Sequence, residues 1–97
     1  MILFKINRSI NSQVLCLCDS DLIGKRLRQG NKQLEITERF YKGEETPKTA
    51  LLSLIKISNN INIIGKESIE FAVRNKLIDK SSIIKIQGIP HAQIFRL

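Results

Sequence analysis

The sequence predicts one small α+β domain over residues 1–97, in which a mixed, mostly antiparallel sheet carries two packed helices and ends in a C-terminal β-hairpin. A chain of 97 residues is long enough for one hydrophobic core and too short for two. Its 42% hydrophobic and 26% charged residues are ordinary values for a folded globular protein. Two stretches with helical periodicity lie between stretches that alternate with a period of two, which is typical of helices packed on a sheet.

Three strands are predicted in the first 40 residues. Ile2, Phe4 and Ile6 recur at every second position, which predicts a strand with one buried face. Residues 14–18 are apolar on both faces, so we expect an interior strand there. Residues 32–37 alternate again and predict a strand whose outer face meets solvent.

The segment between the second and third strands is predicted to turn twice. A short helical turn over residues 20–23 should end at Gly24, and a second turn is expected at Gly30 and Asn31, because glycine and asparagine tolerate left-handed backbone. Residues 25–28 lie between these turns and are strongly basic. A turn-rich link is expected after the third strand.

Two helices are predicted next. Thr46 is a good N-cap and Pro47 a favoured first helical residue, and apolar residues then recur at helical spacing until Asn59 and Asn60. Residues 66–77 form the clearest helical pattern, with ion pairs expected from Lys66 to Glu70 and from Glu70 to Arg74. One stripe of this second helix consists of Ile69, Ala72, Val73, Lys76 and Leu77. Lys76 lies at the edge of this otherwise apolar stripe, where its methylene groups can pack while its amine reaches solvent.

The C-terminal segment predicts a hairpin. Residues 83–87 and 92–97 have strand character, and residues 88–91 form the link between them. Residues 61–64 are expected to be a short extended connection between the helices. The expected order is strand, strand, strand, helix, helix, strand, strand around one sheet.

No membrane partner is predicted. The longest apolar runs, residues 14–18 and 61–64, are far shorter than the roughly 20 residues that span a bilayer. The first residues lack the basic segment and the cleavage site of a secretory signal. Cys16 and Cys18 are two positions apart on a predicted strand, a poor geometry for a disulfide, so reduced thiols in a cytoplasmic protein are expected.

The sequence motifs for cofactors are incomplete. Gly24 and Lys25 lack the first glycine and the hydroxyl of a phosphate-binding loop, so a turn followed by a solvated basic strand is the favoured interpretation. Cys16, Cys18 and His91 supply three soft metal ligands, whereas structural zinc sites take four. We therefore predict no metal and no other cofactor, with both thiols buried in the core.

A catalytic site is an alternative that the sequence leaves open. His91 is a candidate base, with Asp19 or Asp21 to orient it and Cys18 as nucleophile. A single histidine after a proline turn is more often a hydrogen-bonded structural residue, and the sequence favours a protein that is not an enzyme.

The excess of basic residues is the main indication of a partner. Sixteen lysines and arginines against nine acidic residues give a formal charge of +7, which favours polyanions. Phe40 and Tyr41 are the only adjacent aromatic pair, so structured RNA or a duplex fits better than a single strand. A basic surface that only keeps the chain soluble is the alternative. The predicted nucleic-acid-binding residues are Arg8, Lys25, Arg26, Arg28, Lys32, Arg39, Lys42 and Arg96.

Four ordered strings carry a resemblance to a known family. They are LCDSDLIGK at residues 17–25, LEITERFYKG at 34–43, IIGKESI at 63–69 and IQGIPHAQ at 86–93. Over nearly its full length the chain resembles the small archaeal proteins of domain-of-unknown-function family 424. The resemblance implies an archaeal, cytoplasmic, single-domain protein whose genes accompany translation genes. Residues 26–28 are more basic here than the equivalent stretch in relatives, which puts a shared RNA-binding role for this stretch in doubt.

Positions that match the family strings form the predicted common site. We expect its glycines to meet backbone requirements. Asp19 and Lys25 are predicted to converge with His91 and Gln93 on one edge of the sheet. The full set is Asp19, Gly24, Lys25, Phe40, Tyr41, Gly65, Pro90, His91 and Gln93.

Charge, size and resemblance together predict a translation-associated accessory protein that binds RNA or the ribosome through a basic face. Its expected partner is ribosomal RNA or a ribonucleoprotein, with a translation factor as a further candidate. The alternatives are a small enzyme with His91 and Asp19 in a pocket, and an adaptor that binds only protein. The oligomeric state is left open.

Overall fold

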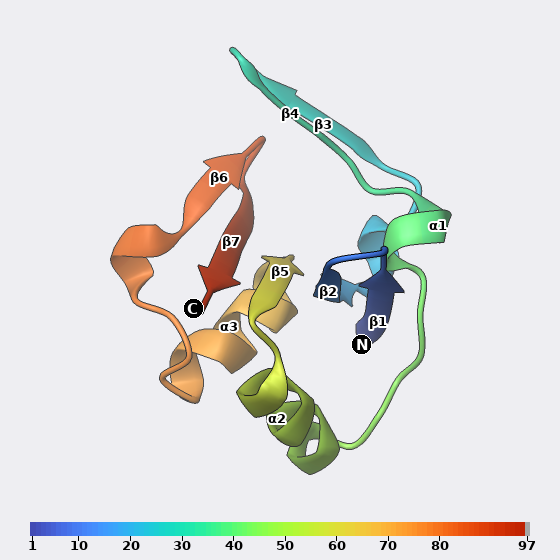
Figure 1. The fold of residues 1–97 in the computed structure, drawn as a ribbon. Helices are drawn as coiled ribbons and strands as arrows, with labels where there is room; N and C mark the ends of the chain where they lie inside the picture. Colours follow the sequence, from blue (N-terminus) through green and yellow to red (C-terminus); the bar gives the residue numbers. More distant parts are fainter. Residues whose placement is uncertain (97) are drawn as a thin grey trace.

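The computed structural model describes residues 1–96 and confirms the predicted α+β fold with a mixed sheet and a C-terminal hairpin (Figure 1). Leu97, the last residue of the predicted terminal strand, lies outside the described residues. The elements in order are β1 (Ile2–Arg8), β2 (Gln13–Asp19), the 3₁₀ turn η1 (Ser20–Leu22), β3 (Arg26–Gln29), β4 (Lys32–Glu35), α1 (Glu38–Tyr41), α2 (Lys48–Ile57), β5 (Asn60–Ile64), α3 (Lys66–Arg74), η2 (Lys80–Ser82), β6 (Ile84–Ile86) and β7 (Ile89–Phe95).

The main sheet has five strands in the order β1-β2-β5-β7-β6. β2 and β5 are parallel, and the other neighbouring pairs are antiparallel. The predicted interior position of β2 is confirmed. Residues 61–64, expected only as a connection, form most of the central strand β5, because Ile61, Ile63 and Ile64 are buried on its two faces.

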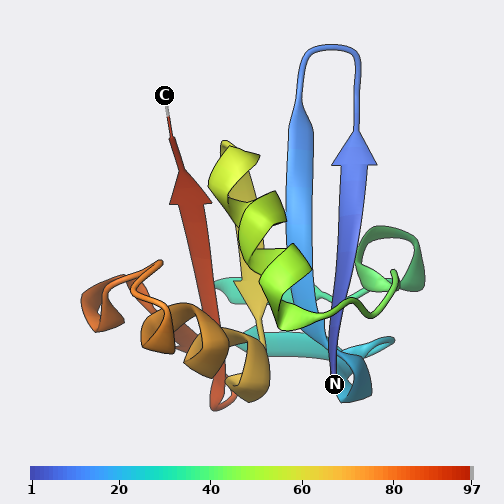
Figure 2. The same ribbon diagram turned by 90° about the horizontal axis from the view of Figure 1, so that it is seen from below.

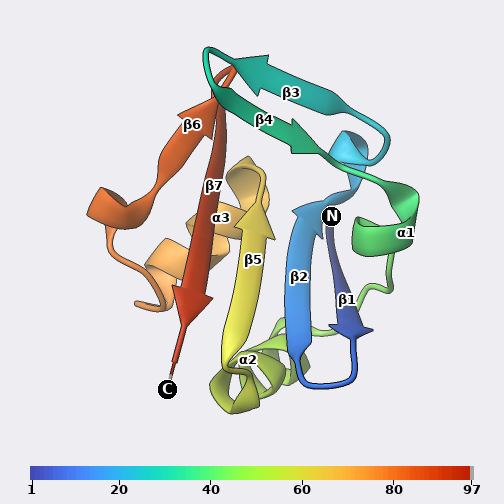
Figure 3. The same ribbon diagram turned by 45° about the horizontal axis from the view of Figure 1, so that its top comes forward.

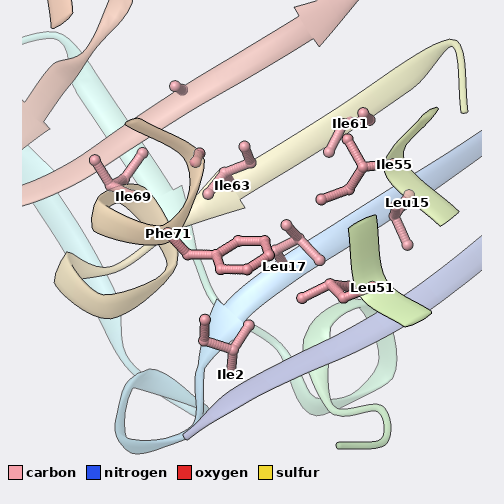
Figure 4. Close-up of a cluster of buried hydrophobic side chains, with 11 residues drawn as sticks. Ile2, Leu15, Leu17, Leu51, Ile55, Ile61, Ile63, Ile69 and Phe71 are labelled. Atoms are coloured by element: carbon pink, nitrogen blue, oxygen red, sulfur yellow. The ribbon is translucent and has the colours of Figure 1, made fainter. Parts of the chain in front are cut away.

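Helices α2 and α3 cover one face of this sheet, which we call the helix face (Figure 2). Its core is built from aliphatic side chains of β2 and β5 and from Leu51, Ile55 and Phe71 of the two helices (Figure 4). Phe71 was not part of the predicted stripe, whereas Ile69 and Ala72 are buried as expected. Burying these side chains is the main stabilising contribution to the fold.

The hairpin β3–β4 and the short helix α1 lie on the opposite face, which we call the hairpin face (Figures 1 and 3). The prediction that residues 32–37 join the main sheet was wrong, since β4 pairs only with β3 in a separate two-stranded sheet. Leu27 and Leu34 face each other across this hairpin and pack onto the second core cluster. Because alternate side chains of a strand point to opposite faces, this hairpin has one apolar side, and it buries that side by packing on the face of the main sheet.

Both predicted helices are present with shifted ends. α2 begins at Lys48, and Pro47 rather than Thr46 occupies the N-cap position. α3 ends at Arg74, before the left-handed Lys76 at φ 57°. The expected ion pairs along α3 are wrong, because the salt bridges among residues 1–96 join the N-terminal amine to Glu67 and Arg26 to Glu35.

The C-terminal hairpin is confirmed, with a tighter turn than expected. Gln87 and Gly88 have φ values of 53° and 78°, the pair of positive angles that a two-residue turn between twisted strands requires. This turn also holds the other hairpin in place. The Gln87 backbone N–H donates to Oε1 of Gln29 at 2.6 Å, and the Arg28 backbone N–H donates to Oε1 of Gln87 at 2.8 Å.

Over the described part of the chain, none of the helices combines the length and the apolar character that crossing a membrane requires.

Candidate nucleic-acid interface

Six of the eight predicted nucleic-acid-binding residues lie on one stretch of chain, residues 24–42. This stretch contains the β3–β4 hairpin and α1, and its only acidic residues are Glu35 and Glu38. Each of the six basic side chains is exposed. They are Lys25, Arg26, Arg28, Lys32, Arg39 and Lys42.

Strand alternation separates the charges of the hairpin from its apolar side. Leu27 is buried against the sheet, so Arg26 and Arg28 project from the other side of β3. Arg26 Nε lies 3.1 Å from Oε1 of Glu35, but both side chains are largely exposed, so this ion pair contributes little stability. Arg28 Nη2 donates to the Gln33 amide at 3.5 Å. The hairpin therefore presents guanidinium groups outward.

The other two residues of the predicted set, Arg8 and Arg96, lie outside this stretch and make their own local contacts. Arg8 is the last residue of β1, at the end of the sheet away from the hairpin, and its Nε donates to Gln13 at 3.1 Å. Arg96 Nη1 donates to the carbonyl oxygens of Ile55 at 2.6 Å and Ser58 at 2.9 Å. Both carbonyls lie at the C-terminal end of α2, and that of Ile55 also accepts from the Ser58 N–H at 3.2 Å.

Asp19 has a structural role at the start of α3. Its Oδ1 accepts from the backbone N–H of Ser68 at 2.8 Å and from the Ser68 hydroxyl at 2.7 Å, and its Oδ2 accepts from the Glu67 N–H at 3.0 Å. Gly65 lies directly against this carboxylate, since a Cβ there would be 2.2 Å from Cγ of Asp19. Asp19 therefore acts as a remote N-cap, and Gly65 leaves the space for it.

His91 lies on the other face of the sheet. Ile64 of β5 pairs with both Cys18 and His91, so Asp19, one residue beyond Cys18 on β2, projects to the opposite face. The predicted pairing of His91 with Asp19 in one pocket is therefore wrong. Gln93 shares the face of His91.

His91 instead ends a buried polar chain that begins at α1. Its Nε2 lies 2.6 Å from Oδ1 of Asn62, and Nδ2 of Asn62 donates to the Tyr41 hydroxyl at 2.9 Å. Because a carboxamide oxygen only accepts, His91 carries its proton on Nε2 and presents Nδ1 as an acceptor. Within residues 1–96, that Nδ1 is enclosed and has no hydrogen-bond donor.

Burial keeps the members of this polar chain neutral. It raises the pKa of Tyr41 to about 12 and lowers the pKa of His91, because a charged form would lose its hydration. Burial also raises the pKa of Cys16 to about 11 and that of Cys18 to about 12. Both thiols are free and buried, as predicted, and they stay protonated at neutral pH, which makes Cys18 a poor nucleophile.

Asn62 is the residue of this chain that the sequence interpretation missed. It is 8% exposed and lies between Ile61 and Ile63 of the central strand. A polar residue inside an otherwise apolar strand was the available signal, because a buried amide needs partners. In the part of the chain that the structure describes, no three side chains of the metal-binding types lie close enough to hold an ion.

The model of a family described as protein of unknown function (DUF424) matches residues 7–97. The chain belongs to the DUF424 family. A crystal structure of an uncharacterized conserved protein from the archaeon Methanopyrus kandleri has the same fold, with 28% identity and a TM-score of 0.80 over 99% of this chain and 91% of that chain. None of the curated proteins matches the sequence. The predicted resemblance is confirmed.

The DUF424 strings of this chain divide into scaffold residues and residues of one face. Gly24 has φ 90° and donates its N–H to the Ile36 carbonyl at 2.7 Å, and the Gly65 N–H donates to the Pro90 carbonyl at 3.0 Å. Phe40 packs edge to face on Tyr41, with 5.1 Å between ring centroids. Scaffold roles therefore account for Asp19, Gly24, Phe40, Gly65 and Pro90, while Lys25 lies on the basic hairpin and Tyr41, His91 and Gln93 lie on the hairpin face.

Proposed function

We propose that this DUF424 protein is a translation-associated accessory protein that binds structured RNA, with ribosomal RNA or a ribonucleoprotein as its partner. The observation that carries the proposal is the concentration of charge on one projecting element. Residues 24–42 hold six exposed basic side chains and two acidic ones, whereas the whole chain has sixteen and nine. The association with translation comes from the family resemblance.

The shape of this element suits a phosphate backbone. A two-stranded ribbon presents its side chains in two rows, and the outward row of β3 carries Arg26 and Arg28. Guanidinium groups bind phosphate oxygens with two parallel hydrogen bonds. Phosphate contacts of this kind fix the position of the protein on the nucleic acid, but they do not distinguish one base sequence from another.

The attachment of the hairpin also supports binding. The reciprocal contacts of Gln29 and Gln87 join its tip to the β6–β7 turn, and Leu27 anchors its inner side. Side chains that are held before binding lose less conformational entropy in a complex. The backbone that carries the basic groups is therefore held in place in the folded protein.

The test compares two variants with the same loss of charge. One neutralises the hairpin by Lys25→Gln, Arg28→Gln and Lys32→Gln. The control neutralises exposed lysines of the helix layer by Lys48→Gln, Lys56→Gln and Lys66→Gln. Binding to a ribosomal RNA stem-loop, and co-sedimentation with ribosomal subunits, are measured over a salt series.

We expect the hairpin variant to lose tenfold or more in affinity, and its slope of log K against log salt to fall by about three, because each lost phosphate contact removes roughly one unit. The control variant should keep an affinity within about twofold of the original. Equal losses in both variants would contradict a localised interface. Association with ribosomes that is insensitive to salt would instead favour the protein-only adaptor.

A further inference from the structure

The hairpin face is only partly covered. α1 packs over β1 and β2, and the β3–β4 hairpin crosses the sheet near the β6–β7 turn (Figure 3). Beyond this cover, Gln93 and Phe95 in the far half of β7 are exposed, and so is Ile84 at the start of β6. We call this region the open corner, and define it by Asn60, Ile84, His91, Gln93 and Phe95.

Side chains of the open corner point the same way because they are paired across the strands. Asn60 pairs with Phe95, and Ile84 pairs with His91. His91, Gln93 and Phe95 follow one another at every second position of β7. Phe95 is 69% exposed and Ile84 is 45% exposed, so an aromatic ring and an aliphatic side chain stand free beside two amides and an imidazole.

Phe95 separates two hollows in the surface. The first has a volume of 310 Å³ and is lined by Ser82, Ile84, His91 and Gln93 together with Phe95. The second has a volume of 440 Å³, and its lining includes Asn60 and the polar β1–β2 turn. The Phe95 ring therefore lines two hollows, and each of them also has polar side chains in its lining.

Two acceptors at the open corner lack donors. Among residues 1–96, the enclosed polar side-chain atoms without a hydrogen-bond partner are His91 Nδ1 and Asn60 Oδ1. Because both atoms are enclosed, the exposed amide of Gln93 is the polar group of the first hollow that a ligand can reach.

The charge around the open corner favours a ligand that belongs to a polyanion. On the five strands of the main sheet, the described side chains that project to the hairpin face include no aspartate and no glutamate. The basic hairpin begins at the other end of β7, about 20 Å away at 3.3 Å per residue. One RNA stem-loop can touch both.

We propose that the open corner binds an unpaired nucleobase of the RNA, stacked on Phe95, with the polar edge of the base beside the exposed amide of Gln93. This inference rests on the proposed function and refines its ligand: a structured RNA with an extruded nucleotide instead of a continuous duplex. An exposed aromatic ring between amide and imidazole groups is the arrangement that RNA-binding proteins use for unstacked bases.

The test uses two RNA hairpins that differ in one position. One carries a single bulged 2-aminopurine, and the other is fully paired. The variants are Phe95→Ala, Phe95→Leu, which keeps apolar bulk without a ring, and Phe95→Tyr, which keeps the ring. Since Phe95 is mostly exposed, all three are expected to fold, and thermal unfolding checks this.

We expect Phe95→Ala and Phe95→Leu to weaken binding of the bulged RNA about tenfold or more, and to abolish the quenching of 2-aminopurine fluorescence that stacking causes. Phe95→Tyr should retain both, and none of the variants should change binding of the paired RNA. If Phe95→Ala binds the bulged RNA as the original protein does, while the hairpin variant fails, the nucleobase site is refuted and the basic interface stands. If the original protein binds neither RNA, the proposed function fails as well.

Discussion

The two faces of the main sheet are covered in different ways, and the difference separates stability from binding. On the helix face, two helices bury a continuous core, and Asp19, the one buried carboxylate among residues 1–96, accepts three hydrogen bonds. On the hairpin face, a thin cover of four-residue strands and one helical turn lies over a polar chain, and part of the surface has no cover. The exposed ring of Phe95 and the unpartnered Nδ1 of His91 both belong to the hairpin face, so this face is the less completely packed of the two.

The largest expected difference concerns the two cores. Ile55→Ala, on the helix face, should lower the free energy of unfolding by about 2–5 kcal/mol, because it opens a cavity in a closed core. Leu27→Ala, on the hairpin, should lower it by only about 1 kcal/mol, because the hairpin can open locally while the sheet stays folded. Urea unfolding measures both. Equal losses would mean that the two faces form one cooperative core.

The next largest effect is expected at Asp19, whose carboxylate accepts three hydrogen bonds on the helix face. Asp19→Ala should lower the free energy of unfolding by about 2 kcal/mol, because the first N–H groups of α3 lose their acceptor. Asp21→Ala removes the same charge from an exposed neighbour and should change stability by less than about 0.5 kcal/mol. RNA binding should stay the same in both variants. A selective loss of binding in Asp19→Ala would return this residue to the functional site.

The smallest effect is expected at His91 on the hairpin face. Its Nε2 has a hydrogen-bond partner, whereas its Nδ1 has none among residues 1–96. The pKa of His91 is lowered by burial, so the unfolded chain takes up a proton near pH 6.5 before the folded chain does. The contribution of this group to stability is therefore complete above pH 6.5, and it is lost as the pH falls toward the folded-state pKa. His91→Gln removes this dependence.

Unfolding of the original protein and of His91→Gln is compared between pH 7.5 and pH 5. The original protein should lose more stability over this interval than the variant does, since the other titrating groups are common to both. Parallel pH profiles would show that His91 is hydrated in the folded state, and they would weaken the contrast between the two faces.

Much of the fold could be predicted from the sequence because it depends on local patterns. The alternation of Ile2, Phe4 and Ile6, the apolar run of β2 and the stripe of α3 each indicate an element through contacts between near neighbours. The ends of α2 and α3 were less predictable. Lys76 in a left-handed conformation ends the stripe one turn early, although its spacing fits the helix.

The candidate site was predictable only in part. Tyr41, His91 and Gln93 were identified through the family strings, and the basic hairpin through composition. Asn62 was missed because its role depends on partners 21 and 29 residues away in the sequence. The hydrogen bonds of Arg96 were missed for the same reason, since its acceptors belong to the end of α2.

By itself the sequence determined the longer helices and most of the strands, which residues are apolar enough to be buried, and how much positive charge the chain carries. The tertiary structure alone decided to which face each polar side chain points. Adjacent strand residues project to opposite faces, and only the packing of α2 and α3 selects the face that becomes the closed core. That choice places Asp19 in the scaffold, and leaves His91 and Phe95 on the open side.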